Sequence, residues 1–239
     1  MLISKIIHFI WLGDVLPDYA DYVMDAYRQV NPDFELKLTH RTIQQLTDIY
    51  NGTFSQEDDD IVKQSIERTL NIGDDEFIRI QLRMYGDDVR FVQVLSDVLR
   101  LELLNRHGGI YVDLDTFPIK PFDDSLLSNT FFAIRRFNGK GFFYDNYFMG
   151  KKPDGNRLVN PYDFTKMYGM NALNHYPSNY MTIRFMVNRD KFFKHKLQIG
   201  DFSFVKDFYI DHYFDGRWRN NIKSGVRVKK IFLDEIWKR

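Results

Sequence analysis

Hydrophobic and polar positions in the N-terminal part of the chain follow two alternating patterns, which predict two strand–helix pairs. The apolar run Ile6–Leu12 predicts a buried strand. Helical spacing of apolar residues over Asp18–Val30 predicts a helix, which Asn31-Pro32 ends. Phe34–Thr39 alternates as a half-exposed strand does, and Thr42–Tyr50 has the pattern of a second helix. Strands that alternate with helices favour a parallel sheet with helices packed on it.

A nearly continuous apolar stretch from Val94 to Leu104 predicts a helix buried inside the protein. Asp97 and Arg100 lie on this stretch, and their spacing puts both side chains on one face of the helix. The pair Gly108-Gly109 is expected to end the helix, because glycine adopts the left-handed backbone conformation without strain.

A short buried strand, Ile110–Val112, is predicted next, and it leads into Asp113 and Asp115. If the backbone stays extended there, the two carboxylates point to the same side. Pro118 indicates that the strand has ended. Ligands bind beyond the carboxyl ends of the strands in open α/β sheets. We therefore expect Trp11 and the two aspartates to flank one crevice.

Four charged side chains, those of Asp97, Arg100, Asp113 and Asp115, stand on an otherwise apolar helix and strand. Burial of a charge without a partner carries a large free-energy cost, so these groups need compensation. Two solutions remain open at this level. In one, Arg100 pairs with Asp97 or with one of the strand aspartates. In the other, the carboxylates bind a divalent cation such as Mg²⁺ or Mn²⁺, which prefers hard oxygen ligands.

The remaining segments give weaker patterns. The acidic run at residues 55–60 predicts the start of a helix, because negative charge is favourable there, and its charges are expected to form a solvated face. Phe131–Arg135 and Tyr147–Gly150 predict further strands, and residues 223–232 predict a strand with one basic face. Residues 211–218 form a stretch rich in groups that bind metal or phosphate.

Composition narrows the class of protein. With 239 residues, 44% of them hydrophobic, the chain is long enough for one large domain with a sizeable core. Basic and acidic residues number 33 each, so no overall field favours nucleic acid. The absence of cysteine excludes disulfides and thiolate metal sites and fits a cytoplasmic location. The N-terminal apolar run is too short for a transmembrane segment.

Four segments carry a resemblance to a known family: KIIHFIWLGD, SDVLRLELLNRHGGIYVDLDTFPIKPF, NYFMGKKPD and HYFDGRW. The chain resembles the DXD-motif sugar transferases of glycosyltransferase family 32. These are related to yeast initiating mannosyltransferases and to the catalytic domains of large bacterial glucosylating toxins. The first two segments are the specific ones, because a bare DXD motif is common by chance.

This resemblance implies an α/β fold of the glycosyltransferase-A (GT-A) type, a Rossmann-like mixed sheet flanked by helices. It implies a single catalytic domain over residues 1–239, with a nucleotide-binding part at about 1–120 and an acceptor-side part at about 121–239. The implied reaction moves a sugar from a UDP- or GDP-sugar donor, with retention and with Mn²⁺ or Mg²⁺ as cofactor. The implied acceptor is a glycan or glycolipid, and peripheral membrane contact is left open.

The same resemblance implies roles for residues in the first two segments. Trp11 matches the tryptophan that stacks on the nucleotide base. Asp97 and Arg100 match the pair that holds the donor-sugar hydroxyls. Asp113 matches the aspartate that contacts sugar and ribose, and Asp115 matches the direct metal ligand.

The C-terminal segment departs from the family pattern. The resemblance places Trp218 against the diphosphate. Many relatives carry a serine where this chain has Arg217, so the last metal ligand is open between His212 and Asp215, in addition to the aspartates of the DXD motif.

Two other functions are weighed against this one. The segment IYVDLDTF also matches the start of haloacid-dehalogenase-type phosphatases, in which Asp113 would be the nucleophile and Asp115 the general acid and base. That motif normally opens a chain, and the phosphatase assigns no role to Trp11. The other alternative is a non-catalytic sugar-binding protein with the same fold.

Overall fold

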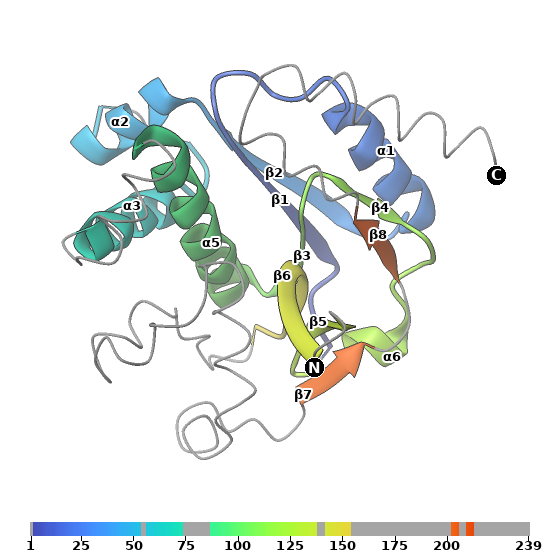
Figure 1. Cartoon of the computed structure of the whole chain (residues 1–239). Helices are drawn as coiled ribbons and strands as arrows, with labels where there is room; N and C mark the ends of the chain where they lie inside the picture. Colours follow the sequence, from blue (N-terminus) through green and yellow to red (C-terminus); the bar gives the residue numbers. More distant parts are fainter. Residues whose placement is uncertain are drawn as a thin grey trace, which may run out of the picture.

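A computed structural model describes residues 2–53, 56–73, 87–137, 142–153, 202–205 and 209–212. These residues form a six-stranded sheet with helices on both faces and a separate two-stranded ribbon (Figure 1). The helices are α1 (Ala20–Val30), α2 (Ile43–Asn51), α3 (Asp59–Gly73), α5 (Asp87–His107) and α6 (Asp124–Leu127). The strands are β1 (Ile6–Leu12), β2 (Glu35–Arg41), β3 (Gly109–Val112), β4 (Thr116–Pro118), β5 (Phe131–Phe137), β6 (Phe142–Lys151), β7 (Phe202–Val205) and β8 (Ile210–His212).

The large sheet is mixed, with the strand order β2-β1-β3-β6-β5-β7. Strand β1 runs parallel to both β2 and β3, and β6 runs antiparallel to β3 and to β5. Strand β7 joins the edge parallel to β5. The predicted α/β class with a Rossmann-like mixed sheet is therefore confirmed.

The N-terminal elements match the predicted order closely, because their boundaries are set by local chemistry. Helix α2 begins with a capping box in which Thr42 and Gln45 satisfy each other's backbone N–H groups. It ends at Gly52, whose φ of 77° is left-handed. The strands predicted after residue 130 are also confirmed, as β5 and β6, while the predicted basic strand at 223–232 lies outside the described residues.

The core has two halves, one on each face of the sheet. Helices α1 and α6 pack on one face, and α2, α3 and α5 pack on the other. Alternate side chains of β1 supply both halves: Ile7 and Phe9 face α1, whereas Ile10 and Leu12 face α5. The predicted burial of the Val94–Leu104 stretch is confirmed for the described side chains Leu95, Val98, Leu99, Leu101, Leu103 and Leu104.

The glycine pair after α5 brings β3 beside β1. Gly108 and Gly109 have φ angles of +66° and +96°, so both occupy the conformation that favours glycine. A Cβ at Gly109 would lie 2.7 Å from the backbone oxygen of Ile6. Any larger residue would therefore separate the two parallel strands.

The predicted end of the Ile110–Val112 strand is confirmed, because β3 ends at Val112, before Pro118. Pro118 itself lies in the next strand, β4, where it pairs with Ile210 of the β4–β8 ribbon. A two-stranded ribbon has an open edge on each strand, and a proline is tolerated there.

The predicted solvated face of the acidic run at residues 55–60 is wrong in part. The run does begin α3 as predicted, but Asp59 is buried against Arg41 in an ion pair of 2.7 Å, with both side chains 6% exposed. Its neighbours are also paired, each over 2.7 Å: Glu57 with Lys37, Asp58 with His107 and Asp60 with Arg106. Only Glu57 and Asp60 are exposed as predicted, because β2 brings Arg41 to Asp59 and the end of α5 brings His107 to Asp58.

His8 supplies a pH-dependent contribution to stability. Its side chain is buried in β1 within 2.9 Å of the Gly108 carbonyl oxygen, and burial is the main cause that lowers its pKa to about 4. The unfolded chain takes up a proton near pH 6.5 and the folded one only near pH 4, so stability is lost as the pH falls through this window. The loss between pH 7 and pH 5 is expected to be about 2 kcal/mol.

A His8→Gln variant is the matched test, because glutamine keeps an N–H donor for Gly108 and does not titrate. Urea unfolding at pH 7 and pH 5 should show a smaller loss in the variant than in the wild type. Equal losses would show that other groups cause the pH dependence.

In the described part of the chain, no helix is both long and apolar enough to span a membrane.

Candidate active site

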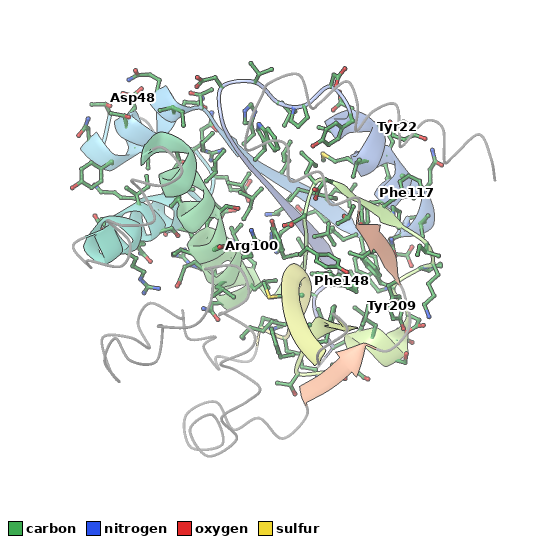
Figure 2. All side chains as sticks on the ribbon, in the orientation of Figure 1. Tyr22, Asp48, Arg100, Phe117, Phe148 and Tyr209 are labelled. Atoms are coloured by element: carbon green, nitrogen blue, oxygen red, sulfur yellow. The ribbon has the colours of Figure 1, made fainter. Side chains whose placement is uncertain are left out.

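Arg100 forms the centre of the candidate site (Figure 2). Its guanidinium group contacts Asp97 on the same helix at 3.0 Å and Asp113 beyond β3 at 3.1 Å. The side chains of Arg100 and Asp97 are 8% and 5% exposed, and that of Asp113 is 26% exposed. The sequence left open whether Arg100 pairs with Asp97 or with a strand aspartate. In the structure it pairs with both Asp97 and Asp113.

Further contacts fix the orientation of this arginine. Its Nε and Nη2 atoms lie 3.3 Å from the backbone oxygen and the hydroxyl of Ser96, one helical turn earlier. Its guanidinium carbon lies 4.5 Å from the centre of the Tyr111 ring. The Tyr111 hydroxyl in turn donates to Asp113 Oδ1 over 2.6 Å. Burial raises the pKa of Tyr111 well above its usual value, so the phenol keeps the proton that it donates.

The two aspartates of the DXD motif, Asp113 and Asp115, lie on the turn between β3 and β4, which we call the DXD turn. The backbone N–H of Thr116 donates to the Asp113 carbonyl oxygen over 3.2 Å, which closes the segment between β3 and β4. The prediction that the backbone stays extended through Asp113 and Asp115 is therefore wrong. The N–H of Asp113 donates to the carbonyl oxygen of Tyr147 on β6 over 2.9 Å, so β3 ends with Asp113 still fixed to the sheet.

A second set of contacts reaches the turn from α1. The Thr116 hydroxyl donates to the Asp113 carbonyl oxygen over 2.6 Å, and the Tyr27 hydroxyl lies 2.8 Å from Thr116 Oγ1. Both side chains are fully buried. The turn is thus held by Arg100 and Tyr111 on the α5 side and by Tyr27 on the α1 side.

Trp11 lies near the carboxyl end of β1, partly buried against the core on the α1 side. Its indole N–H donates to the carbonyl oxygen of Val15 over 2.8 Å. The loop after β1 is held by the end of β2. The backbone carbonyl oxygen of Arg41 accepts the N–H of Gly13, and His40 Nε2 lies 3.0 Å from the Gly13 carbonyl oxygen. Since β1 and β3 are parallel neighbours, Trp11 and Asp113 lie at the same edge of the sheet.

The C-terminal segment reaches the site through the ribbon. His212 is the register partner of Thr116, so the backbone of β8 ends beside the DXD turn. Asp215 and Trp218, which the sequence also predicted for the site, lie outside the described residues. Across the described ranges, no group of three His, Cys, Asp or Glu side chains is arranged to hold a metal ion.

The donor set still fits a Mg²⁺ or Mn²⁺ ion in its chemistry. Asp113 and Asp115 supply carboxylate oxygens, which are the hard ligands that these ions prefer. Mg²⁺ is typically held by one or two carboxylates together with substrate phosphates, and not by a complete protein cage. Fewer than three protein ligands in the described residues is compatible with such a site.

Sequence reasoning missed three residues of the site. The sequence pattern predicts Tyr111 only as a core residue of the strand. Its spacing of two from Asp113 is nevertheless a signal, because residues two apart on a strand share one face. Thr116 follows the motif at the distance at which a turn closes, which is a usable signal. For Tyr27, no signal in the sequence links it to a residue so distant along the chain.

Two models of known protein families match the chain. The model described as "Glycosyltransferase sugar-binding region containing DXD motif" matches residues 17–133, which include α1, β3 and the DXD turn. A second model, described as "Capsular polysaccharide synthesis protein", matches residues 84–221. The phosphatase and the non-catalytic alternatives gain no support from these matches.

One individual relative shares a low sequence identity with part of the chain. The chain is 29% identical over 125 residues to the Legionella pneumophila protein named subversion of eukaryotic traffic protein A, a match that covers 52% of this chain and 19% of the relative. The chain thus spans about a fifth of that relative's length.

Among solved structures, the PaToxG glycosyltransferase superposes with a TM-score of 0.53 at 16% identity, over 80% of this chain and 71% of that one. This likeness shows the fold, which is that of GT-A glycosyltransferases.

Three observations assign the chain to a protein family. They are the mixed sheet, the arginine between two aspartates at its carboxyl edge, and the matches to two family models. The chain is a glycosyltransferase of the DXD-motif class, and it belongs to the family described as capsular polysaccharide synthesis proteins.

Proposed function

We propose that this protein is a metal-dependent glycosyltransferase of family 32 that moves a sugar from a nucleotide-sugar donor to a carbohydrate acceptor with retention. The observation that carries the proposal is the placement of Asp97 and Asp113 on one buried arginine, with Asp115 on the adjoining turn. Carboxylates held in this way are preorganised acceptors for the hydroxyl groups of a sugar.

We assign a role to each residue of the candidate site that the structure describes. Asp97 and Asp113 accept hydrogen bonds from the donor sugar, and Arg100 pairs with both carboxylates and holds them in orientation. Trp11 offers its ring to the nucleotide base at the same edge of the sheet. Asp115 holds the divalent ion, which when bound stabilises the negative charge of the departing nucleoside diphosphate.

The C-terminal segment completes the site in our proposal. Pairing of His212 with Thr116 supports this, because it starts the segment beside the DXD turn. We assign the last protein ligand of the ion to His212 or Asp215, and the contact with the diphosphate to Trp218.

Several finer points remain predictions. The division of one catalytic domain at about residue 120, the cytoplasmic location and the choice between UDP and GDP follow from the family resemblance and the composition. A glycan or glycolipid acceptor is favoured by the description of the second family model.

A panel of UDP- and GDP-sugars with Mn²⁺ tests the proposal. Even without acceptor, the protein should slowly hydrolyse one donor to sugar and nucleoside diphosphate, and EDTA should stop this hydrolysis. Turnover that is insensitive to EDTA would refute the metal role of Asp115. Release of phosphate from an aryl phosphate, lost in Asp113→Asn, would instead identify a phosphatase.

A further inference from the structure

The DXD turn spans the edge of the sheet and is anchored on both faces. On the α5 side, Arg100 and Tyr111 bind the carboxylate of Asp113. On the α1 side, Thr116 binds the Asp113 carbonyl oxygen through its hydroxyl and through its backbone N–H. Asp115 lies between Asp113 and Thr116, so its position depends on both anchors.

Each of the two side-chain hydrogen bonds on the α1 side, Thr116 to Asp113 and Tyr27 to Thr116, has only one possible donor. The carbonyl oxygen of Asp113 can only accept, so the Thr116 hydroxyl uses its single proton there. Tyr27 must then donate to Thr116 Oγ1. Burial raises the pKa of Tyr27 well above its usual value, and the charges of Asp113 and Asp115 add to the rise. The phenol therefore remains a donor, and it lies within the electrostatic reach of both carboxylates.

Packing alone does not require these hydroxyl groups. Tyr27 and Thr116 are fully buried, and the rings of Phe9 and Phe122 surround Tyr27. A phenylalanine and a valine would fill the same space without burying a polar atom. The Thr116 hydroxyl binds the backbone of the turn directly, and the Tyr27 hydroxyl supports Thr116 from the neighbouring helix α1 (Figure 1).

We propose that Tyr27 and Thr116 are positioning residues that hold Asp115 in the orientation in which it binds the divalent ion. The chain of contacts runs from the Tyr27 hydroxyl on α1, through the Thr116 hydroxyl, to the Asp113 carbonyl that closes the turn. This inference rests on the proposed metal-dependent transfer, and it adds to that proposal the helix that orients the metal ligand.

The test uses direct binding of Mn²⁺, measured by electron paramagnetic resonance in the presence of UDP or GDP, whichever binds the wild-type protein. Tyr27→Phe and Thr116→Val each remove one hydroxyl and should weaken Mn²⁺ binding by about 10-fold or more, as removal of groups that orient a metal ligand typically does. Thr116→Ser keeps the hydroxyl and should restore the wild-type affinity.

Tyr22→Phe is the matched control, because it removes a hydroxyl from the same helix (Figure 2). The pKa of Tyr22 is raised by burial alone, without a contribution from the two aspartates. This variant should bind Mn²⁺ as the wild type does.

The melting temperature of each variant shows whether the variant is folded at the temperature of the Mn²⁺ binding measurement. If Tyr27→Phe and Thr116→Val bind Mn²⁺ like the wild type, whatever their melting temperatures, the positioning role is wrong while the proposed function stands. If the wild-type protein itself does not bind Mn²⁺ with either diphosphate, both are wrong.

Discussion

An Asp115→Ala variant is expected to lose turnover by about 10³-fold, because the developing charge on the leaving diphosphate would lose about 4 kcal/mol of stabilisation. Asp115 lies on the turn between β3 and β4, where it adds a second carboxylate next to Asp113. Asp113 already shares its arginine with Asp97, and the DXD motif adds Asp115 to this acidic segment. In the proposed function, Asp115 serves to bind a cation and not to stabilise the fold.

The loss of turnover should therefore come without a loss of stability. The melting temperature of Asp115→Ala should equal that of the wild type or exceed it, because removal of one carboxylate relieves repulsion within the acidic pair. Donor hydrolysis with Mn²⁺ and thermal unfolding are the two measurements. Asp33→Ala, which removes an exposed carboxylate near the end of α1, is the control and should change neither.

Unfolding of Asp115→Ala at a much lower temperature would show that Asp115 belongs to a structural ion pair. Full activity of the variant would show that the ion is held elsewhere. Either result would remove Asp115 from the proposed metal site.

An Arg100→Ala variant is expected to destabilise the protein by about 3–5 kcal/mol, because it leaves two carboxylates without their cation in a largely buried place. For a domain of this size, that corresponds to a fall in melting temperature of about 10 °C. Turnover should also fall, since Asp97 and Asp113 would no longer be held in place for the sugar hydroxyls. Chemical denaturation and donor hydrolysis measure the two effects.

The chain contains a matched control for this experiment. Arg28 pairs with Asp25 on α1 with the same sequence separation, but the two side chains are 57% and 60% exposed. Arg28→Ala should therefore cost about 0–1 kcal/mol. Arg100→Lys should lie between wild type and alanine, because an ammonium group keeps the charge but cannot span both carboxylates in one plane. Equal effects of Arg28→Ala and Arg100→Ala would contradict the central role of Arg100.

Local chemistry explains which elements could be predicted from the sequence. Strand β1 has the predicted bounds, and α2 begins and ends at the residues that cap it, Thr42 and Gly52. Gly108-Gly109 ends α5 as expected. These features depend on residues within one or two turns of each other, so they can be recognised without knowledge of the rest of the fold.

The predictions that failed required knowledge of distant partners. The acidic side chain of Asp59 is buried because Arg41, at the end of β2, reaches it. The backbone at Asp113 turns, where alternation alone predicted an extended strand, because Thr116 closes it.

The sequence by itself determined the charged residues of the candidate site and the order of the elements that carry them, because Asp97, Arg100, Asp113 and Asp115 lie in one continuous motif. Only the tertiary structure decided that one arginine serves two aspartates and that Tyr27 supports the turn from the other face of the sheet. The physical reason is that a hydrogen bond between buried groups far apart in sequence forms only after the sheet and both helix layers have packed.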